Sequence, residues 1–336
     1  MKKYEHGGDI YNNSVRLDFS VNTNPLGISD RVREAVISGA DAFGVYPDAD
    51  YAELRRVVAE HEGVKSENIL CSNGASEMIF AAVRAVMPKR ALLIAPTFSE
   101  YERAFLSVGC EIEYYTLKEE NEFIIGSDFI AGLKSVDMAF ICNPNNPAGN
   151  IADRALTDKI ADVCAERNII CIIDECFMDL ADNGYSMKGK MPVIKAFTKT
   201  YAMAGLRLGY IIGDTKICGD IKKQLPAWNV SAAAQAGGIA ALNDGGYIEK
   251  SRIYIKRERE FLTEELRKLG FKAFKSDTNF ILIKGQSGIG ERLLERGILI
   301  RSCTNFRGLD ESFYRVAVKA HTDNAELIRE LGDICG

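Results

Sequence analysis

The sequence predicts an α/β fold, with a large domain on a mainly parallel sheet and a smaller α+β domain. Its 336 residues exceed what a single hydrophobic core usually serves. Between about Glu53 and Gly213, short apolar runs alternate with amphipathic helical stretches, which is typical of strands and helices arranged around a parallel sheet. From about Tyr247, one long charged helical stretch is followed by several short strands. Two domains of different construction therefore follow from the pattern.

The predicted domain boundaries follow these changes of pattern. Residues 1–31 are rich in Asn, Gly and Asp and carry little helical or strand signal, so we expect an N-terminal arm that joins the small domain and borders the active site. Residues 32–245 are expected to form the large ligand-binding domain, and residues 246–336 the small C-terminal domain. The sequence contains no internal repeat.

Each element has its own signal in the sequence. Short apolar runs of strand length are bounded by turn residues, and the stretch from Asp153 to Arg167 predicts a helix between two of them. The long charged helix of the small domain is expected within residues 251–270, and a shorter helix within 288–296. The expected strands are residues 68–71, 91–95, 111–115, 138–142, 169–174 and 193–197 in the large domain, and 271–275, 279–284, 297–301 and 313–319 in the small one.

Composition excludes several classes of function. No stretch approaches the roughly 18 consecutive apolar residues of a membrane helix, and the N-terminus lacks the apolar region of a secretory signal, so we expect a cytoplasmic protein. Nine cysteines without a C-x-x-C pair indicate reduced thiols, and with only three histidines they argue against a metal site. A net charge of -5 without a basic stripe argues against nucleic acid as a partner.

The first candidate for chemistry is Lys199, which follows the apolar run VIKAF and precedes a Gly-containing turn that leads to Arg207. Taken alone, such a lysine is usually a solvated surface residue, and such an arginine usually pairs with a carboxylate. In open α/β sheets, however, ligands bind beyond the carboxyl ends of the strands. The residues at the other strand ends therefore decide between these readings.

Two polar residues follow the neighbouring strands. Asp174 ends the run IICIID, where its carboxylate either caps a helix or holds the pyridine nitrogen of pyridoxal phosphate protonated, which makes the ring an electron sink. Asn146 lies in NPNNPAG after the strand MAFIC, where it could donate a hydrogen bond to the ring hydroxyl. Asn-Pro pairs also mark ordinary turns.

A phosphate site is predicted after the strand NILC. Gly74, Ala75 and Ser76 open a helix there, and the free amides of a helix N-terminus bind anions, unless Ser72 or Asn73 caps them. Phe98, in PTFSEY, ends the next strand, where its ring could stack on the pyridine or simply pack in the core.

Together these segments resemble the class I and II aminotransferases, which are fold type I pyridoxal-phosphate enzymes, over nearly the whole chain. The resemblance implies that pyridoxal 5'-phosphate is carried by Lys199 as a Schiff base, with Asp174 as the partner of the ring nitrogen. It also implies cofactor-binding roles for further residues: Asn146 at the ring oxygen, Phe98 stacked on the ring, and Gly74, Ala75, Ser76, Thr198 and Arg207 around the phosphate.

The same resemblance predicts a homodimer with shared active sites. Tyr46, in VYPDADYAELRR, matches a tyrosine that reaches the cofactor phosphate across the dimer interface in such enzymes. Arg315, in FYRVAVK, matches the arginine that grips the substrate carboxylate, and its planar guanidinium suits a bidentate contact.

Within this superfamily the chain resembles the threonine-phosphate decarboxylases of cobalamin synthesis and, next, the histidinol-phosphate aminotransferases. The N-terminal HGGD, the run IDECFMDL and the segment RSCTNFRGLDESFYRVAVK favour the decarboxylases. Aminotransferases commonly carry a tyrosine at the position of Phe177, which hydrogen-bonds the ring oxygen. A small phosphorylated amino acid or amine is therefore the expected substrate, and the candidates for binding it, besides Arg315, are Arg301, Asn24, His6 and Arg307.

Two departures from the decarboxylase pattern leave the ligand open. Relatives typically have asparagine at the position of Asp9, and a carboxylate beside an anionic substrate would be unfavourable. Ala196 stands where a hydroxyl residue is usual.

The expected reaction is loss of carbon dioxide from L-threonine O-3-phosphate to give 1-amino-2-propanol phosphate, with Lys199 reprotonating the α-carbon. The alternative is transamination with 2-oxoglutarate, in which Lys199 removes the α-hydrogen. The choice depends on which bond stands perpendicular to the cofactor ring. A third hypothesis is a non-catalytic ligand-sensing domain. The presence of both Lys199 and Asp174 argues against it.

Overall fold

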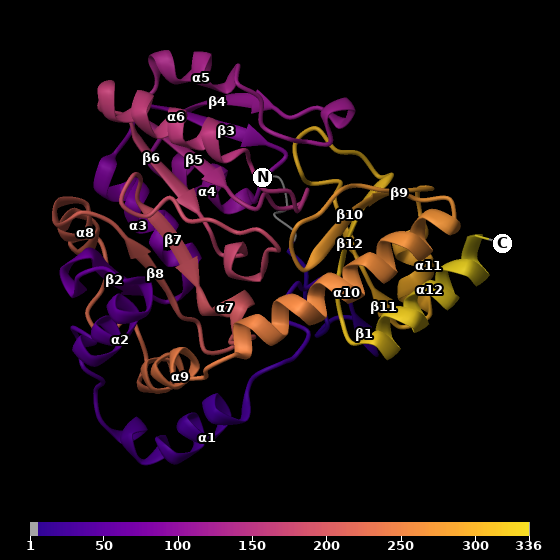
Figure 1. Ribbon diagram of the computed structural model, residues 1–336, viewed down its shortest axis with the longest axis horizontal. Helices are drawn as coiled ribbons and strands as arrows, with labels where there is room; N and C mark the ends of the chain where they lie inside the picture. The colour runs from indigo at the N-terminus through magenta and orange to yellow at the C-terminus, as the bar shows by residue number, and fades with distance from the viewer. Residues whose placement is uncertain (1–5, 336) are drawn as a thin grey trace.

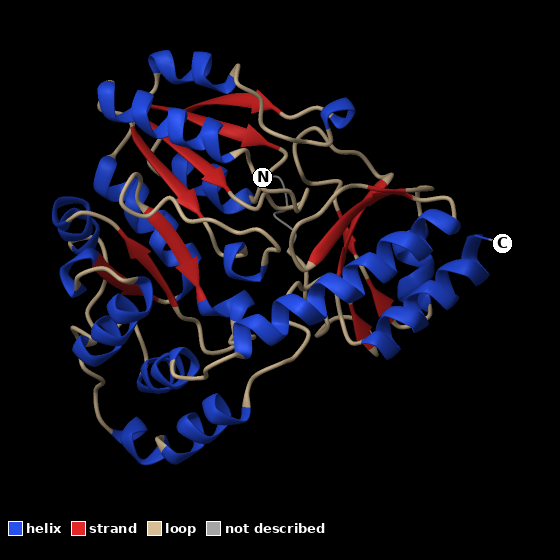
Figure 2. Ribbon diagram, viewed as in Figure 1, coloured by secondary structure: helices blue, strands red, loops and turns tan. Residues whose placement is uncertain are grey.

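The computed structural model describes residues 6–335, and its centre is a seven-stranded sheet of order β2-β8-β7-β6-β5-β3-β4 (Figure 2). All pairs are parallel except those of β8, which is antiparallel to both β2 and β7. The α/β class predicted from the sequence is confirmed. The strands are β2 (Ile69–Ser72), β3 (Arg90–Ala95), β4 (Glu111–Thr116), β5 (Met138–Cys142), β6 (Ile170–Asp174), β7 (Val193–Ala196) and β8 (Gly209–Ile212).

Strand β8 has no counterpart among the strands expected from the sequence. Its four residues follow a Gly-containing turn, so the apolar run is short and carries no clear boundary. It fills the gap between β2 and β7, where Ile211 pairs with both Leu70 and Ile194.

Helices cover both faces of this sheet (Figure 1). The helix expected from Asp153 to Arg167 is α6, and the Asp153 carboxylate caps it by accepting a hydrogen bond from the Leu156 amide at 2.9 Å. The helices of this part are α1 (Asp30–Ser38), α2 (Ala52–Glu62), α3 (Gly74–Val86), α4 (Ser99–Ser107), α5 (Phe129–Gly132), α6 (Arg154–Glu166), α7 (Phe197–Thr200), α8 (Thr215–Lys222) and α9 (Ala232–Leu242), with short 3-10 turns η1 (Ala40–Gly44), η2 (Ser66–Asn68), η3 (Glu119–Asn121), η4 (Leu133–Ser135) and η5 (Met178–Leu180).

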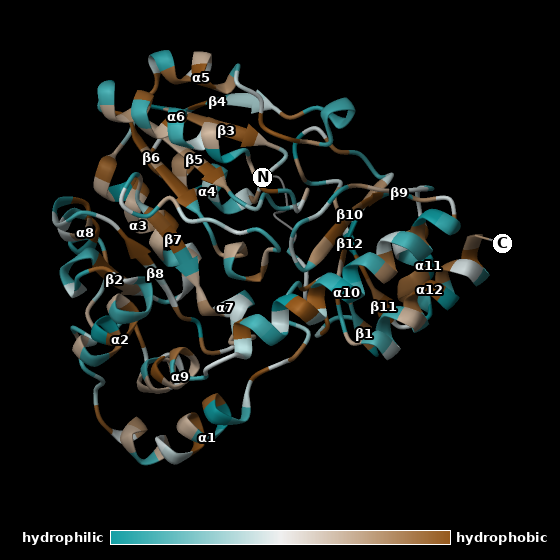
Figure 3. Cartoon of the chain, viewed as in Figure 1, coloured by the Kyte–Doolittle hydropathy of each residue, from teal (hydrophilic) through white to brown (hydrophobic). Residues whose placement is uncertain are grey.

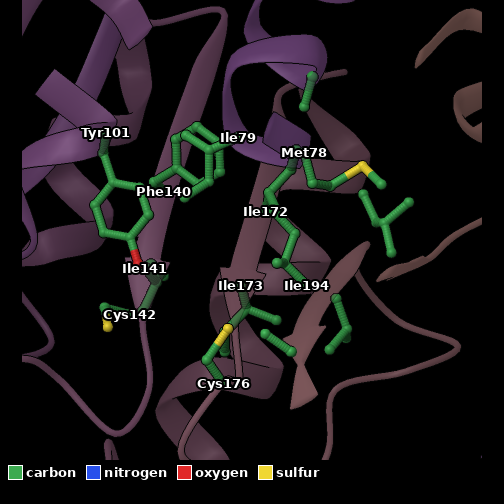
Figure 4. Packing of buried hydrophobic residues seen from close by; sticks show 14 of the residues in the cluster. Met78, Ile79, Tyr101, Phe140, Ile141, Cys142, Ile172, Ile173, Cys176 and Ile194 are labelled. Atoms are coloured by element: carbon green, nitrogen blue, oxygen red, sulfur yellow. The ribbon is translucent and has the colours of Figure 1, made fainter. Parts of the chain in front are cut away.

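The core of the large sheet is apolar because its central strands are buried on both faces. Strand β5 is buried at every residue, and β6 at every residue but its first. Figure 3 shows these strands as hydrophobic and the surrounding helices as a mixture of hydrophilic and hydrophobic residues. In Figure 4, Tyr101 of α4 points toward the sheet beside Phe140 of β5, with ring centroids 5.0 Å apart.

A second sheet and a second core lie toward the C-terminus. The antiparallel order is β12-β13-β10-β9, packed under α10, which connects the two parts in Figure 1. The buried residues of α10 recur every three or four positions, as expected of a helix with one face on a core. The elements are α10 (Tyr247–Lys268), β9 (Lys272–Ala273), β10 (Phe280–Lys284), α11 (Ile289–Glu295), β11 (Ile298–Leu299), β12 (Arg301–Ser302), β13 (Phe313–Ala317) and α12 (His321–Cys335).

The N-terminal segment packs against this second part. Strand β1 (Leu17–Asp18) pairs in parallel with β11, and Phe19 is fully buried in the second core beside Ile281 and Val316. The boundaries 1–31, 32–245 and 246–336 stay predictions. None of the helices within residues 6–335 has both the length and the apolar composition that a transmembrane span needs.

Candidate active site

A cavity of about 300 Å³ lies at the carboxyl ends of the central strands, between the large sheet, the N-terminal segment and the small sheet. The strand order explains part of this arrangement. Strand β7, which Lys199 follows, lies beside β6, which ends in Asp174, and β8 lies between β7 and β2. The cavity brings together most of the residues singled out from the sequence: His6, Ala75, Ser76, Phe98, Asn146, Asp174, Thr198, Lys199, Arg207, Arg301 and Arg315. Gly74, Tyr46, Asn24 and Arg307 do not line it.

Asp174 is held in one orientation at the carboxyl end of β6. Its Oδ1 accepts a hydrogen bond from the Cys176 amide at 2.9 Å, and its Oδ2 accepts one from the Tyr101 hydroxyl at 2.7 Å. Only 4% of its surface is exposed, and this burial raises the pKa of the Asp174 carboxyl. A cationic group in the cavity is the partner that would favour its charged form.

Tyr101 is a functional residue that the sequence did not reveal. It lies fully buried on α4, stacked on Phe140, and its hydroxyl donates to Asp174. The sequence pattern around PTFSEY pointed to Phe98 alone. A tyrosine on the buried face of a helix is ordinary core composition, so no local signal marks its contact with a residue 73 positions away.

Lys199 lies on the short helix α7, immediately after β7. No side chain within residues 6–335 forms a hydrogen bond or ion pair with its Nζ, which faces the cavity. Burial, followed by the positive charge of Arg315, lowers the pKa of Lys199 to about 8. An amine with this pKa is a nucleophile and a proton carrier at physiological pH.

The lowered pKa predicts how the cofactor-free protein takes up pyridoxal phosphate. Only the neutral amine attacks a carbonyl carbon, and about half of Lys199 is neutral at pH 8, against well under about 1% for a solvated lysine. The uptake rate, followed by absorbance, should rise up to about pH 8 and then level off. In Arg315→Met, loss of the positive charge raises the pKa, so the levelling moves to higher pH. A wild-type rate that keeps rising toward pH 10 would contradict this account.

An anion site lies at the N-terminus of the 13-residue helix α3. Neither Ser72 nor Asn73 caps it: the Ser72 hydroxyl donates to the Gly74 carbonyl, and the Asn73 side chain accepts no bond from the helix. The amides of Ala75 and Ser76 are therefore available to a ligand. Gly74 does not line the cavity, but a Cβ there would lie 2.5 Å from the Arg207 guanidinium, so glycine lets that side chain approach.

Arg207 completes the anion site with an unusual backbone. Its φ of 59° lies in the left-handed region, which is uncommon for a residue other than glycine. Such strain persists where the surrounding structure holds it, often at functional sites. The guanidinium contacts the Ala204 carbonyl at 3.3 Å and lines the cavity together with Thr198.

Two arginines of the small sheet meet at the cavity. Arg301 of β12 and Arg315 of β13 are direct partners in the antiparallel register, and only 7% and 5% of them are exposed. Arg315 donates to the Asn146 side chain and, at 2.7 Å, to the Ser20 carbonyl, while its buried Nε has no partner within the described residues. Burial lowers the pKa of Arg315 to about 10. Two adjacent buried guanidiniums are suited to an anionic ligand.

Asn22 is a second residue that the sequence did not single out. It lines the cavity with 2% of its surface exposed, and its buried Nδ2 has no hydrogen-bond partner within residues 6–335. An unpaired buried donor is costly, and a polar ligand would satisfy it. Asn22 and Asn24 share one polar segment, so the sequence does not tell them apart.

Asn24, predicted to bind substrate, instead supports Lys199 from behind. Its backbone N–H donates to the Lys199 carbonyl at 3.0 Å. Its side-chain Nδ2 donates to the Thr200 carbonyl at 2.8 Å and to the Ser251 hydroxyl at 2.7 Å. With 3% of its surface exposed, it ties α7 to the long helix α10. Its side-chain bonds go to protein groups, and it does not line the cavity.

Replacing Asn24 by alanine should therefore act on stability and catalysis together. Loss of its buried side-chain hydrogen bonds is expected to lower the free energy of unfolding by about 2–3 kcal/mol, and kcat should fall because Lys199 is less firmly placed. Asn12→Ala, which removes an exposed asparagine of the same segment, should stay within about 0.5 kcal/mol. Equal denaturation midpoints for the two variants would contradict the supporting role.

The structure places Arg307 away from the cavity. Its guanidinium lies over the Tyr114 ring at 3.8 Å and pairs with Glu102 at 3.2 Å. Asp9 is also outside: its carboxylate accepts a hydrogen bond from the Asn12 side chain at 2.7 Å. The unfavourable carboxylate expected beside the substrate therefore does not arise. Ala196 does line the cavity, at the end of β7.

The remaining predicted residues border the cavity or the surface. Phe98 packs edge-on against Tyr101 at 5.7 Å, and the Phe177 ring packs edge-on against Phe280 at 5.0 Å. Tyr46 is 79% exposed and lies against Trp228, with ring centroids 4.7 Å apart. Tyr46 thus lies on the surface, and its contact with a second subunit stays a prediction.

The residues present fit the cofactor predicted from the sequence. A buried carboxylate at Asp174, a nucleophilic amine at Lys199 and free helix amides at Ala75 and Ser76 match a pyridinium nitrogen, an aldehyde and a phosphate group.

Comparison with known proteins agrees with this arrangement. The family model described as aminotransferase class I and II matches residues 15–332. The threonine-phosphate decarboxylase of Salmonella typhimurium is 34% identical over 98% of this chain and 96% of its own. A protein of Caldanaerobacter subterraneus, provisionally named as the same enzyme, is 38% identical over 98% and 94%. The crystal structure of a histidinol-phosphate aminotransferase from Clostridium acetobutylicum has a TM-score of 0.89 at 33% identity, covering 95% of this chain and 99% of that one.

Proposed function

This chain belongs to the class I and II aminotransferases, and we propose that it decarboxylates L-threonine O-3-phosphate to 1-amino-2-propanol phosphate and carbon dioxide, a step of cobalamin synthesis. It is a pyridoxal-phosphate enzyme. The alternative within the family is transamination of histidinol phosphate with 2-oxoglutarate. The cytoplasmic location expected from the sequence stays a prediction.

The charge of the cavity is the observation that carries the proposal. Among the described residues lining it, the basic ones, apart from His6, are Lys199, Arg207, Arg301 and Arg315, whereas Asp174 is the one acidic residue. The helix amides and Arg207 are sufficient for the cofactor phosphate. Arg301 and Arg315 line the part of the cavity formed by the small sheet, and two guanidiniums suit a ligand with both a phosphate and a carboxylate.

Phe177 favours decarboxylation over transamination. Its ring packs on Phe280 and offers no hydroxyl to the cofactor ring oxygen, which the tyrosine common in aminotransferases would provide. The N-terminal segment supports the same reading, because His6 and Gly7 of the HGGD motif line the cavity. A Cβ at Gly7 would lie 2.4 Å from the Ser20 carbonyl, so glycine is needed for this close packing.

The chain supplies orientation and proton transfer to the proposed reaction. When bound, pyridoxal phosphate would supply an electron sink for the electron pair that stays on the α-carbon after carbon dioxide departs. Asp174 would hold the ring nitrogen protonated, and Phe98 would stack on the ring. Arg315 binds the carboxylate, while Arg301, Asn22 and His6 bind the phosphate, which fixes the bond that breaks.

Lys199 closes the reaction by placing a proton on the α-carbon where the carboxylate was. Its pKa of about 8 suits this role, because the amine both gains and gives up a proton near neutral pH. In the alternative reaction, the same Nζ would remove the α-hydrogen.

Arg315→Lys is expected to raise KM for the substrate about tenfold or more with a smaller effect on kcat, because a lysine cannot form the bidentate contact. Steady-state kinetics of the purified enzyme measure both constants. An unchanged KM would mean that another group binds the substrate carboxylate. The control is Arg292→Lys, on the outer side of the small domain.

We propose that the enzyme is a homodimer in which Tyr46 reaches the partner's cofactor phosphate. Exposed large apolar side chains near Tyr46 support a surface that a second subunit covers. These are Ile37, Phe43, Val45 and Trp228, which are between 49% and 69% exposed. Sedimentation of the wild-type protein tests the assembly.

The reaction is tested by two parallel incubations of the cofactor-loaded protein. One contains L-threonine O-3-phosphate and is assayed for carbon dioxide and the amine. The other contains histidinol phosphate and 2-oxoglutarate and is assayed for glutamate. Carbon dioxide without glutamate supports the decarboxylase, and glutamate without carbon dioxide overturns it in favour of the aminotransferase.

A further inference from the structure

Glu100 is a buried carboxylate beside the cavity that the reaction outlined above does not use. It lies in the first turn of α4, two residues after Phe98, and only 6% of it is exposed. Its Oε1 lies 3.0 Å from the His6 Nε2 and accepts a hydrogen bond from Arg103 at 2.9 Å. Glu100 thus joins the large domain to the imidazole of the N-terminal segment through a polar contact.

The contact between Glu100 and His6 adds no net negative charge beside the proposed substrate phosphate. Although burial opposes ionisation, the hydrogen bonds from His6 and Arg103 lower the pKa of the Glu100 carboxyl, so it is charged at neutral pH. The charge of Arg103 on the same helix balances it. The carboxylate can therefore hold a histidine near the substrate phosphate without repelling that phosphate.

Besides Glu100, the His6 ring contacts Phe98. Its side chain is 45% exposed, and its ring centroid lies 6.0 Å from that of Phe98. The backbone of the segment is held nearby, where the Gly8 amide donates to the Ser20 hydroxyl at 2.8 Å. With Nε2 donating to Glu100, Nδ1 is the ring nitrogen that remains for a phosphate group, to which it donates when the ring carries both protons.

We propose that Glu100 is a positioning residue that fixes the imidazole of His6 at the rim of the cavity, so that His6 binds the phosphate group of the substrate. The inference rests on the proposed function only in requiring a phosphorylated amino acid or amine as ligand. It holds for the decarboxylase and the aminotransferase alike, since the substrates of both carry a phosphate.

The test uses the cofactor-loaded enzyme and three variants, Glu100→Gln, His6→Ala and the double variant. Calorimetric titration with inorganic phosphate gives Kd, and steady-state kinetics with the turned-over phosphorylated substrate give KM and kcat. Loss of the contact between Glu100 and His6 is expected to raise Kd and KM about five- to twentyfold, with kcat within about twofold of wild type. Because Glu100 acts through His6, the double variant should bind phosphate no more weakly than His6→Ala.

A matched control is present in the small domain. Glu258, 1% exposed, contacts His321 at 2.9 Å, and neither residue lines the cavity, so Glu258→Gln removes the same kind of charge without touching the site. Its Kd and KM should equal those of the wild type.

Three results would overturn the role of Glu100. They are a wild-type Kd in Glu100→Gln, a wild-type Kd in His6→Ala, and fully additive effects in the double variant, which would mean that Glu100 acts independently of His6. His6→Ala changes an exposed residue and keeps the proposal falsifiable even if Glu100→Gln folds poorly. If the wild-type enzyme turns over neither phosphorylated substrate, the proposed function fails, while the phosphate Kd values still decide the role of Glu100.

Discussion

Lys199→Ala is expected to lower kcat by a factor of about 10⁴ or more while leaving a folded protein. The substitution removes both the amine that carries the cofactor and the group that moves the proton at the α-carbon. Its Nζ has no hydrogen-bond partner within the described residues, so the fold loses no polar contact with it. Turnover assays and a thermal denaturation curve measure the two effects separately.

Lys195, on the strand β7 that directly precedes α7, provides the contrasting variant. It is buried in ion pairs with Glu62 at 2.9 Å and Asp179 at 2.8 Å. Lys195→Met should therefore lower the Tm strongly, because Asp179 loses this ion pair and Glu62 is left with its pair to Lys188. The cofactor should remain bound in this variant. If Lys199→Ala kept more than about one hundredth of the wild-type kcat, the role of Lys199 would be lost.

Asp174→Asn is expected to lower kcat by about 10²–10³, because the neutral amide no longer favours a protonated ring nitrogen. Asparagine keeps the size of the side chain and its contact with the Cys176 amide, so the effect reports on charge. Steady-state kinetics at saturating cofactor give the value.

The neighbouring Glu175 is a matched control for Asp174. It is buried, its Oε1 accepts a hydrogen bond from the Met187 amide at 2.7 Å, and it does not line the cavity. Burial raises its pKa to about 7, so glutamine resembles its neutral form. Glu175→Gln should therefore leave kcat nearly unchanged, and equal losses in the two variants would assign the effect of Asp174→Asn to general destabilisation.

The fold and many of the residues that line the cavity were predictable because strands and their ends have local signals. Lys199, Asp174 and Asn146 each follow a short apolar run, and topology alone brings such positions to one edge of a sheet. The family resemblance then assigned a role to each of them.

The residues that the sequence did not reveal act through contacts between distant segments. Tyr101 reaches Asp174, and Glu100 reaches His6, by side-chain bonds that no periodicity reports. Asn22 and Asn24 are chemically identical neighbours, and only packing places one in the cavity and the other behind Lys199. Arg307 lies in a polar loop where Glu102 and Tyr114 bind its guanidinium.

The most direct test of the account is to reduce the cofactor-loaded protein with borohydride, digest it with trypsin and locate the pyridoxyl group by mass spectrometry. A group on Lys199 blocks cleavage there and should appear in the peptide from Ala196 to Arg207. Recovery of the group on Lys195 or another lysine, with residues 196–207 cut normally after Lys199, would contradict the central claim.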